Sequence, residues 1–186
     1  MLKKLRQKKE TDMSVIKENQ KITENVSIRT SGLKSFPLLA GLSDEDLSAL
    51  MQILHEMKFQ EGTEILTEGE EGSLMFLLLE GEVDVIKKTP YGDPYVTASL
   101  KGSDGCSFGE MALIDRGTRS ATVRARTDCR VLSLNYEEFQ TFCREYPKIG
   151  LELLMSISIT LVRNLRKENE NLRLVYQALI EEIENE

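Results

Sequence analysis

The spacing of hydrophobic residues changes twice along the chain, and the first regular stretch has helical spacing. Leucine and methionine recur every three or four residues between positions 43 and 57. Ser43 supplies an N-cap hydroxyl, and the acidic residues that follow it suit a first helical turn. These features predict one amphipathic helix over residues 43–57, which would carry the only histidine, His55.

From Phe59 the pattern changes to short apolar runs separated by glycines, nine of which lie between Gly62 and Gly117. Residues 82–85 alternate polar and apolar side chains, as a half-buried strand does. Further strands are expected at 95–100, 120–126 and 129–134. Many short strands joined by turns predict an antiparallel barrel or sandwich.

Helical spacing returns in the last part of the chain. Asn135 and Glu138 resemble a capping box, which predicts a short helix over residues 136–145 that stops before Pro147. The remaining residues are expected to form one long helix.

The long helix has a single narrow apolar stripe near a three-four spacing, interrupted by Glu168 and Glu182. The members of the stripe are Leu161, Leu165, Leu172, Val175 and Leu179. A narrow stripe favours pairing between molecules, so we expect a homodimer formed through this helix. The alternative is a helix folded back onto its own barrel, and the pattern leaves parallel and antiparallel pairing open.

Composition and charge exclude several classes of protein. The 24 basic and 31 acidic residues give a net charge of -7, the wrong sign for a protein that coats nucleic acid. The longest apolar run, residues 74–79, is too short for a membrane span, and no signal-peptide core follows the start, which predicts a cytoplasmic protein. Three cysteines without a CxxC pair indicate reduced thiols, and a single histidine argues against a metal site or a metalloenzyme.

The chain divides into three expected parts. Residues 1–35 are expected to form an N-terminal tail or loose helix, partly disordered, with five basic residues in the first ten. We interpret this part as a solvated arm, with contact to a membrane surface or an acidic partner as the alternative. Residues 36–146 form the barrel, and residues 147–186 form a C-terminal lid and dimerisation helix.

Candidate chemistry is concentrated in Phe108-Gly109-Glu110-Met111-Ala112-Leu113-Ile114 and in Arg119-Ser120-Ala121-Thr122-Val123. Gly109 allows a ligand to approach the backbone, and residues 110–115 can form one helical turn whose N–H groups face an anion. Arg119 shares a strand face with small apolar residues, where its charge requires an anion such as a phosphate. Glu110 could accept a hydrogen bond from a ribose hydroxyl, although Glu110 and Arg119 could instead pair with each other.

The two segments FGEMALI and RSATV resemble the phosphate-binding cassette of the cyclic-nucleotide-binding domain family. The resemblance extends over about residues 36–165 and includes Phe36-Pro37-Leu38-Leu39, the glycines at 62, 69, 72 and 81, and Arg124-Ala125. It implies a mainly β fold with flanking helices, namely an eight-stranded jelly-roll β-barrel (double-stranded β-helix) plus a long C-terminal helix.

The resemblance also implies a set of binding residues. Glu110 would bind the ribose 2′-hydroxyl, Arg119 the cyclic phosphate, and backbone N–H groups near Ala112 and Ser120 would complete the phosphate cradle. The full set of implied ligand-binding residues is Phe108, Gly109, Glu110, Met111, Ala112, Arg119, Ser120, Ala121, Val123, Val85, Leu100 and Asn164. Val85, Leu100 and Val123, together with Met75, are candidates for the pocket lining, or else ordinary core residues.

Two positions bear on the choice of base. Ser120 directly follows the cassette arginine, where the resemblance associates Ala or Ser with cAMP and Thr with cGMP, although a serine hydroxyl could also serve cGMP. Asn164 lies where bacterial regulators of this family place a polar residue over adenine, and its amide could read the adenine edge. The alternative for Asn164 is a solvated helix residue.

These expectations describe a non-enzymatic sensor or regulatory module that binds a purine cyclic mononucleotide, cAMP first, and signals through its C-terminal helix. No metal, no transmembrane span and no DNA-binding domain after Asn164 are expected, and the downstream partner is not identified. The alternatives are a cGMP sensor and a scaffold protein whose barrel binds nothing. A phosphodiesterase is disfavoured because no metal-ligand set or nucleophile and base can be assembled.

Overall fold

The computed structural model describes residues 30–115 and 117–184 of the 186-residue chain. The expected N-terminal arm over residues 1–35 therefore lies outside the described residues, except for its end. That end contains the short helix α2 (Thr30–Leu33), whose Leu33 is fully buried.

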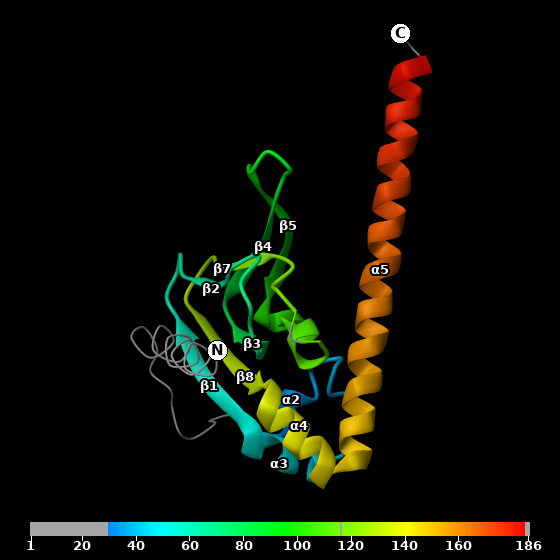
Figure 1. Ribbon diagram of the computed structural model, residues 1–186. Coiled ribbons are helices and arrows are strands. Elements are labelled where there is room, and N and C mark those ends of the chain that lie inside the picture. The colour runs from blue at the N-terminus through cyan, green and yellow to red at the C-terminus, as the bar shows by residue number, and fades with distance from the viewer. Residues whose placement is uncertain (1–29, 116, 185–186) are drawn as a thin grey trace, which may run out of the picture.

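Two four-stranded antiparallel sheets form the jelly-roll barrel, as expected from the sequence (Figure 1). One sheet has the order β1 (Leu54–Phe59), β8 (Cys129–Asn135), β3 (Leu74–Glu80), β6 (Ser107–Phe108). The other has the order β2 (Glu64–Leu66), β7 (Thr122–Ala125), β4 (Glu82–Lys88), β5 (Pro94–Lys101). Strands distant in sequence are neighbours in both sheets, so the barrel depends on long-range pairing.

The interior of the barrel is built by alternate residues of the strands. On β3, Phe76 and Leu78 face the barrel core, whereas Met75 and Leu77 belong to a second hydrophobic cluster with the helices. The Phe76 ring stacks on Phe108 at 5.2 Å between centroids and meets the edge of Phe59 at 6.1 Å. β3 thus separates the two hydrophobic clusters.

Helices gather at one end of the barrel: α3 (Asp44–Leu50), α4 (Tyr136–Glu145) and the start of α5 (Pro147–Glu184) (Figure 1). Ser43 and Asp46 form a complete capping box at α3. At α4 the Asn135 side chain accepts from the Glu137 N–H at 2.8 Å, as a cap does. Glu138 does not complete a capping box there, because its carboxylate contacts the His55 ring at 3.0 Å.

The predicted helix over residues 43–57 is wrong in its second half. α3 ends at Leu50, a 3-10 turn covers Met51–Ile53, and β1 begins at Leu54. β1 pairs with β8 along its whole length, from Leu54 opposite Leu134 to Phe59 opposite Cys129. Long-range pairing overrides the helical spacing here, so His55 lies on a strand rather than on a helix.

The long helix α5 is buried only near its start. Ile149, Leu153 and Ile157 pack into the helical cluster, whereas residues 162–184 are exposed along their whole length. The alternative of a helix folded back onto the barrel therefore does not hold for residues 162–184 (Figure 1). Within residues 30–115 and 117–184, no helix is long and apolar enough to cross a membrane.

Two glycines in turns test how tightly the barrel is packed. Gly81 and Gly92 both have positive φ, 92° and 95°. A Cβ on Gly81 would collide with the Asp128 carbonyl and lie 2.8 Å from the Cys129 Sγ, whereas one on Gly92 would meet no described atom within 4 Å.

We expect Gly92→Ala to lower the free energy of unfolding by about 1–2 kcal/mol, the cost of a left-handed alanine. Gly81→Ala should lower it by roughly 1–3 kcal/mol more, because the added methyl group overpacks the barrel. Urea unfolding of both variants measures the difference, and equal losses would contradict the packing at Gly81.

Candidate nucleotide-binding site

The predicted helical turn after Gly109 is present as η3 (Glu110–Leu113). Gly109 begins it with a φ of 76°, a conformation that favours glycine. A Cβ at this position would lie 3.0 Å from the Leu74 carbonyl oxygen and 3.1 Å from Arg119 Nη1. The glycine is therefore required both by the turn and by the close approach of β3 and Arg119.

Arg119 is held in place by its backbone and by its side chain. Its N–H donates to the Glu70 carbonyl at 2.8 Å, and its carbonyl accepts from the Gly69 N–H at 2.9 Å. The guanidinium donates from Nη2 to the Leu74 carbonyl at 2.8 Å and from Nη1 to the Gly109 carbonyl at 3.4 Å. These contacts fix the guanidinium beside the N-terminal end of η3.

The charge of Arg119 is not matched by a carboxylate in the part of the chain that the structure describes. The alternative in which Glu110 and Arg119 simply pair is therefore not realised among these residues. Burial lowers the pKa of Arg119, yet an arginine stays protonated in a protein. A desolvated guanidinium bonded only to neutral carbonyls provides a binding position for an anion.

The carboxylate of Glu110 complements the guanidinium of Arg119, because it accepts hydrogen bonds and does not donate them. Burial raises the pKa of its carboxyl group, and no cation among the described residues pairs with it. The carboxylate can therefore gain stability from a hydrogen-bond donor on a ligand. Glu110 directly follows Gly109, whose carbonyl accepts from the guanidinium of Arg119. A carboxylate that can accept from a hydroxyl group and a guanidinium that can bind an anion suit a ligand with hydroxyl and phosphate groups.

Gly72 is a site residue that the sequence identified only as a turn glycine. A Cβ on Gly72 would lie 2.6 Å from the guanidinium carbon of Arg119, so the glycine leaves room for the arginine side chain. Its φ is not in the left-handed region, so no local signal in the sequence indicates this role. Leu74 also contributes only a backbone carbonyl, which the sequence could not reveal.

Most of the other predicted site residues lie around this segment or in the adjoining core. Phe108 and Val123 are buried in the barrel cluster, with Val85 and Leu100 partly buried against it. Met75 lies in the helical cluster instead, so the structure does not bring it together with the other lining candidates.

The remaining cassette residues differ in exposure. Ala112 and Ala121 are buried, and Met111 and Ser120 are exposed. Asn164 is exposed on α5, and its side chain makes no hydrogen bond to the described residues. The Ala112 N–H donates to the Gly109 carbonyl at 3.2 Å, so it is already engaged inside the turn. The Ser120 N–H has no acceptor within the described residues and is the freer of the two predicted cradle groups.

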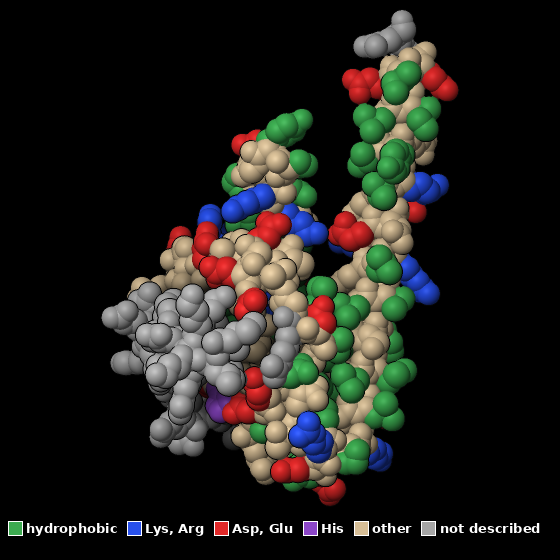
Figure 2. Space-filling model, viewed as in Figure 1, with side chains coloured by type: hydrophobic (Ala, Val, Ile, Leu, Met, Phe, Trp, Pro, Cys, Tyr) green, Lys and Arg blue, Asp and Glu red, His purple; other side chains and the backbone are tan. Residues whose placement is uncertain are grey.

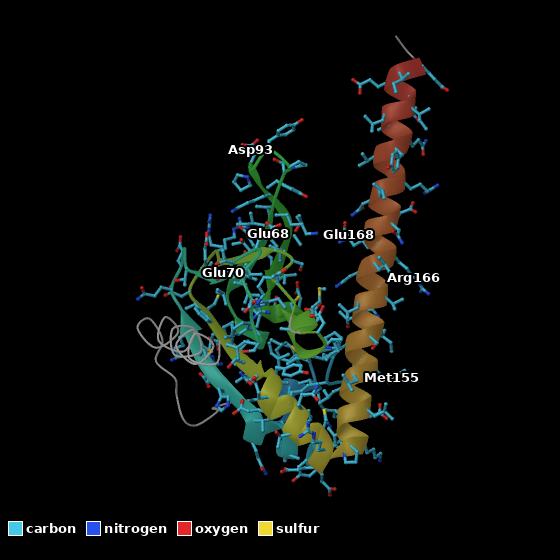
Figure 3. All side chains as sticks on the ribbon, viewed as in Figure 1. Glu68, Glu70, Asp93, Met155, Arg166 and Glu168 are labelled. Atoms are coloured by element: carbon cyan, nitrogen blue, oxygen red, sulfur yellow. The ribbon has the colours of Figure 1, made fainter. Side chains whose placement is uncertain are left out.

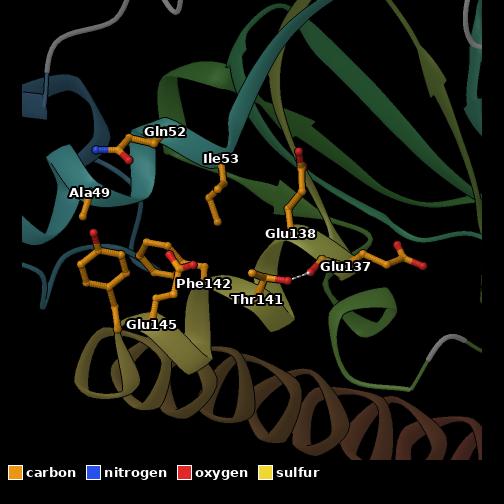
Figure 4. A pocket seen from close by; sticks show the side chains of 9 residues that line it. Ala49, Gln52, Ile53, Glu137, Glu138, Thr141, Phe142 and Glu145 are labelled. Atoms are coloured by element: carbon orange, nitrogen blue, oxygen red, sulfur yellow. Dashed lines mark hydrogen bonds between the residues drawn. The ribbon is translucent and has the colours of Figure 1, made fainter.

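A separate hollow of about 300 Å³ lies between α4 and the 3-10 turn η1 (Met51–Ile53) (Figure 4). Its lining residues are Ala49, Gln52, Ile53, Glu137, Glu138, Thr141, Phe142, Glu145 and Tyr146. Three carboxylates on its wall repel phosphate, and no residue of the cassette reaches it. A ligand that carries a phosphate group therefore fits the cassette better than this hollow.

Residues 56–146 match the sequence model of the family described as the cyclic nucleotide-binding domain. This chain carries a cyclic nucleotide-binding domain. The resemblance inferred from the FGEMALI and RSATV segments is confirmed at the level of the family. Among the described residues, no group of histidine, cysteine and acidic side chains could hold a metal ion.

Similar proteins include ion channels. The domain is 37% identical over 113 residues to the potassium/sodium hyperpolarization-activated cyclic nucleotide-gated channel 2 of Mus musculus, covering 61% of this chain and 12% of the channel. It is 31% identical over 143 residues to channel 1 of Oryctolagus cuniculus, covering 77% of this chain and 15% of that channel. The chain thus corresponds to a small part of these relatives.

Solved structures of regulatory proteins have the same fold. The catabolite activator protein of Thermus thermophilus superposes with a TM-score of 0.67 at 28% identity, covering 75% of this chain and 62% of that one. The regulatory domain of Toxoplasma gondii PKA, solved with cAMP, superposes with a TM-score of 0.61 at 25% identity, covering 76% of this chain and 49% of that one.

The room that Gly72 leaves for Arg119 leads to a binding prediction. Gly72→Ala should displace the guanidinium and weaken cyclic-nucleotide binding by about 1–3 kcal/mol, because a charge-assisted hydrogen bond is lost. Stability should change little, because the methyl group meets the end of a flexible side chain. Calorimetric titration measures the affinity. Gly41→Ala, where a Cβ meets no described atom within 4 Å, is the matched control and should bind normally.

The raised pKa of Glu110 leads to a prediction about pH. Burial destabilises the ionised form of this carboxyl group, so the group costs the fold nothing at low pH, where it is protonated in both states. The cost appears as the pH rises above the pKa of the unfolded chain and is complete above the raised pKa of the folded state. Glu110→Gln should therefore increase the free energy of unfolding at pH 7 and change it little at pH 3.5. The same variant should bind cyclic nucleotide more weakly. Urea unfolding at both pH values tests the sign, and a loss of stability at pH 7 would contradict it.

Proposed function

We propose that this domain binds cAMP as a non-enzymatic sensor and transmits binding through α5. The observation that carries the proposal is the guanidinium of Arg119, desolvated and fixed by the Leu74 and Gly109 carbonyls without a carboxylate partner among the described residues. A cyclic phosphate supplies two free oxygens that match the fork of this guanidinium.

The residues around Arg119 provide the contacts to the ribose, to the phosphate and to the base. Glu110 accepts a hydrogen bond from the ribose 2′-hydroxyl, which offsets the desolvation of its carboxylate. The Ser120 N–H donates to the phosphate. Val85, Leu100 and Val123 offer an apolar surface to the purine base.

The preference for cAMP over cGMP depends on Ser120. The residue is exposed two positions before β7 begins at Thr122, next to Arg119, so its side chain is available to a bound base. In similar domains Ala or Ser at this position is associated with cAMP and Thr with cGMP, which supports cAMP as the first ligand. The regulatory domain of Toxoplasma gondii PKA that was solved with cAMP also supports this choice.

The path from the site to α5 runs through Leu113. Leu113 ends η3, is 1% exposed, and belongs to the cluster that contains Leu153 and Ile157 of α5. A ligand that pulls on Gly109 and Glu110 therefore changes the packing against α5. Binding shifts the population of α5 positions, and the nucleotide leaves unchanged.

The proposal includes a homodimer formed through α5 and a cytoplasmic location. Exposed apolar residues along α5 support the first, since a large apolar surface marks an interaction site. Three free cysteines, Cys106, Cys129 and Cys143, support the second, because thiols persist in a reducing compartment.

Calorimetric titration with cAMP, cGMP and 5′-AMP tests the proposal. We expect cAMP to bind most tightly and 5′-AMP weakly, because the acyclic phosphate carries a different charge and shape. Arg119→Ala should cost about 2–4 kcal/mol of binding free energy, and more than Glu110→Ala, because it leaves the phosphate charge unpaired.

Arg124→Ala is the matched control for Arg119→Ala. Arg124 lies on β7, is exposed, and bonds to Glu64 at 2.7 Å away from the cassette. The Arg124→Ala variant should bind cAMP with the affinity of the natural chain. Tighter binding of cGMP than of cAMP would identify cGMP as the ligand instead. If none of the three nucleotides binds, the result would support a scaffold whose barrel binds nothing. Small and equal losses for Arg119→Ala and Glu110→Ala would overturn the cassette assignment.

A further inference from the structure

The largest unexplained feature of the described structure is the apolar surface of α5 beyond the barrel. Figure 2 shows hydrophobic side chains repeated along this helix, far from the barrel core. This apolar surface extends from Leu151 to Ile183, a distance of about 48 Å at the rise of an α-helix.

A seven-residue repeat runs along this surface over four heptads, and it places Leu161 and Val175 of the stripe expected from the sequence at position g, beside the seam. The residues at one seam position, a, are Met155, Val162, Asn169, Tyr176 and Ile183, and those at the other, d, are Leu151, Ser158, Leu165, Leu172 and Leu179. All ten are exposed in the chain. A repeat sustained over four heptads is typical of a coiled coil.

We propose that two copies of this chain pair through α5 as a parallel, in-register, two-stranded coiled coil centred on Asn169. The proposal deepens the homodimer of the proposed function and shares its assumption that α5 pairs with itself. It does not depend on nucleotide binding, so the two can fail separately.

Asn169 determines orientation and register. It is the only polar residue at position a, and its amide must find a partner once the seam is buried. In a parallel, in-register pair the amide faces the amide of Asn169 in the second copy. An antiparallel pair would place it against a d residue, and a parallel pair shifted by one heptad would place it against Val162 or Tyr176. A single buried Asn at position a is known to select orientation and oligomer state in this way.

Charges beside the seam match the same arrangement. Glu168, directly before Asn169, occupies position g, and Arg173, five residues after Glu168, occupies position e. In a parallel coiled coil these two positions meet across the interface, so Glu168 of one copy faces Arg173 of the other. Arg173 already bonds to Glu170 of its own helix at 2.6 Å, which orients its guanidinium. Figure 3 shows Glu168 and Arg166 projecting from opposite sides of α5, as positions g and e require.

A second copy fits better than an unrelated partner because the surface is complementary to itself. The amide of Asn169, the opposite charges of Glu168 and Arg173, and the leucines at position d all find their counterparts in an identical helix. No such match is available to a partner that lacks the same spacing.

The chain offers a matched pair of residues for the first test. Leu172 at position d and Leu174 at position f are equally exposed in a single chain, 52% and 53%. Only Leu172 lies in the seam. Leu172→Lys should convert a dimer into a monomer in light scattering at tens of micromolar protein, and Leu174→Lys should leave it dimeric. Loss of the dimer in both variants, or in neither, would overturn the seam.

A second test measures orientation. Ile183→Cys places a thiol at position a near the end of α5, where two copies meet only if they run parallel and in register. Oxidation should give a disulfide-linked dimer on a non-reducing gel. Leu174→Cys, which faces away from the seam, and the natural chain with its own three cysteines are the controls and should stay unlinked.

A third variant tests the register of the coiled coil. Asn169→Leu should give a more stable assembly with a higher midpoint of thermal unfolding, and the yield of the Ile183→Cys disulfide should fall in that background, because other registers become allowed. A dimer in which Ile183→Cys does not cross-link would overturn parallel pairing. A chain that remains monomeric would overturn the coiled coil, whereas cAMP titration of the same samples reports on the nucleotide site independently.

Discussion

The structure depends on holding a charged guanidinium in a largely desolvated position before any anion is bound. The Leu74 and Gly109 carbonyls accept from Arg119, and Gly72 and Gly109 provide the space in which its side chain lies. Neutral carbonyls compensate the charge only in part, which leaves the guanidinium with binding capacity. The paired backbone bonds of Arg119 to Gly69 and Glu70 keep this position fixed.

The arrangement around Arg119 also explains why the barrel and the helices form one unit. β3 supplies the Leu74 carbonyl to the site, Phe76 and Leu78 to the barrel core, and Met75 and Leu77 to the helical cluster. η3 has the same double character, because Glu110 lies at the site and Leu113 in the helical cluster. In the proposed function, short elements that serve two clusters would couple ligand binding to the packing of α5.

Much of the fold could be predicted from the sequence, because glycine spacing and alternating strands are local patterns. The cassette could be identified because its residues are nearly contiguous. Leu54–Phe59 could not be predicted as a strand, since its partner β8 lies far along the chain and only that pairing selects the extended conformation. Gly72 and the Leu74 carbonyl were missed for a related reason: they contact Arg119 across 45 or more residues, and a backbone group leaves no trace in the residue type. Met75 stayed open between pocket lining and ordinary core because alternation does not say which face of β3 is the interior.

The continuity of α5 has a mechanical consequence. The helix runs without interruption from Pro147, beside α4, to Glu184, a length of about 57 Å. Its first four turns pack on the core as far as Leu161, and residues 162–184 are exposed. A tilt of only about 5° at the base would move the far end by roughly 5 Å, close to the rise of one helical turn. In the proposed sensor, the helix would act as a lever that converts sub-ångström repacking around Leu113 into a displacement of several ångströms at its far end.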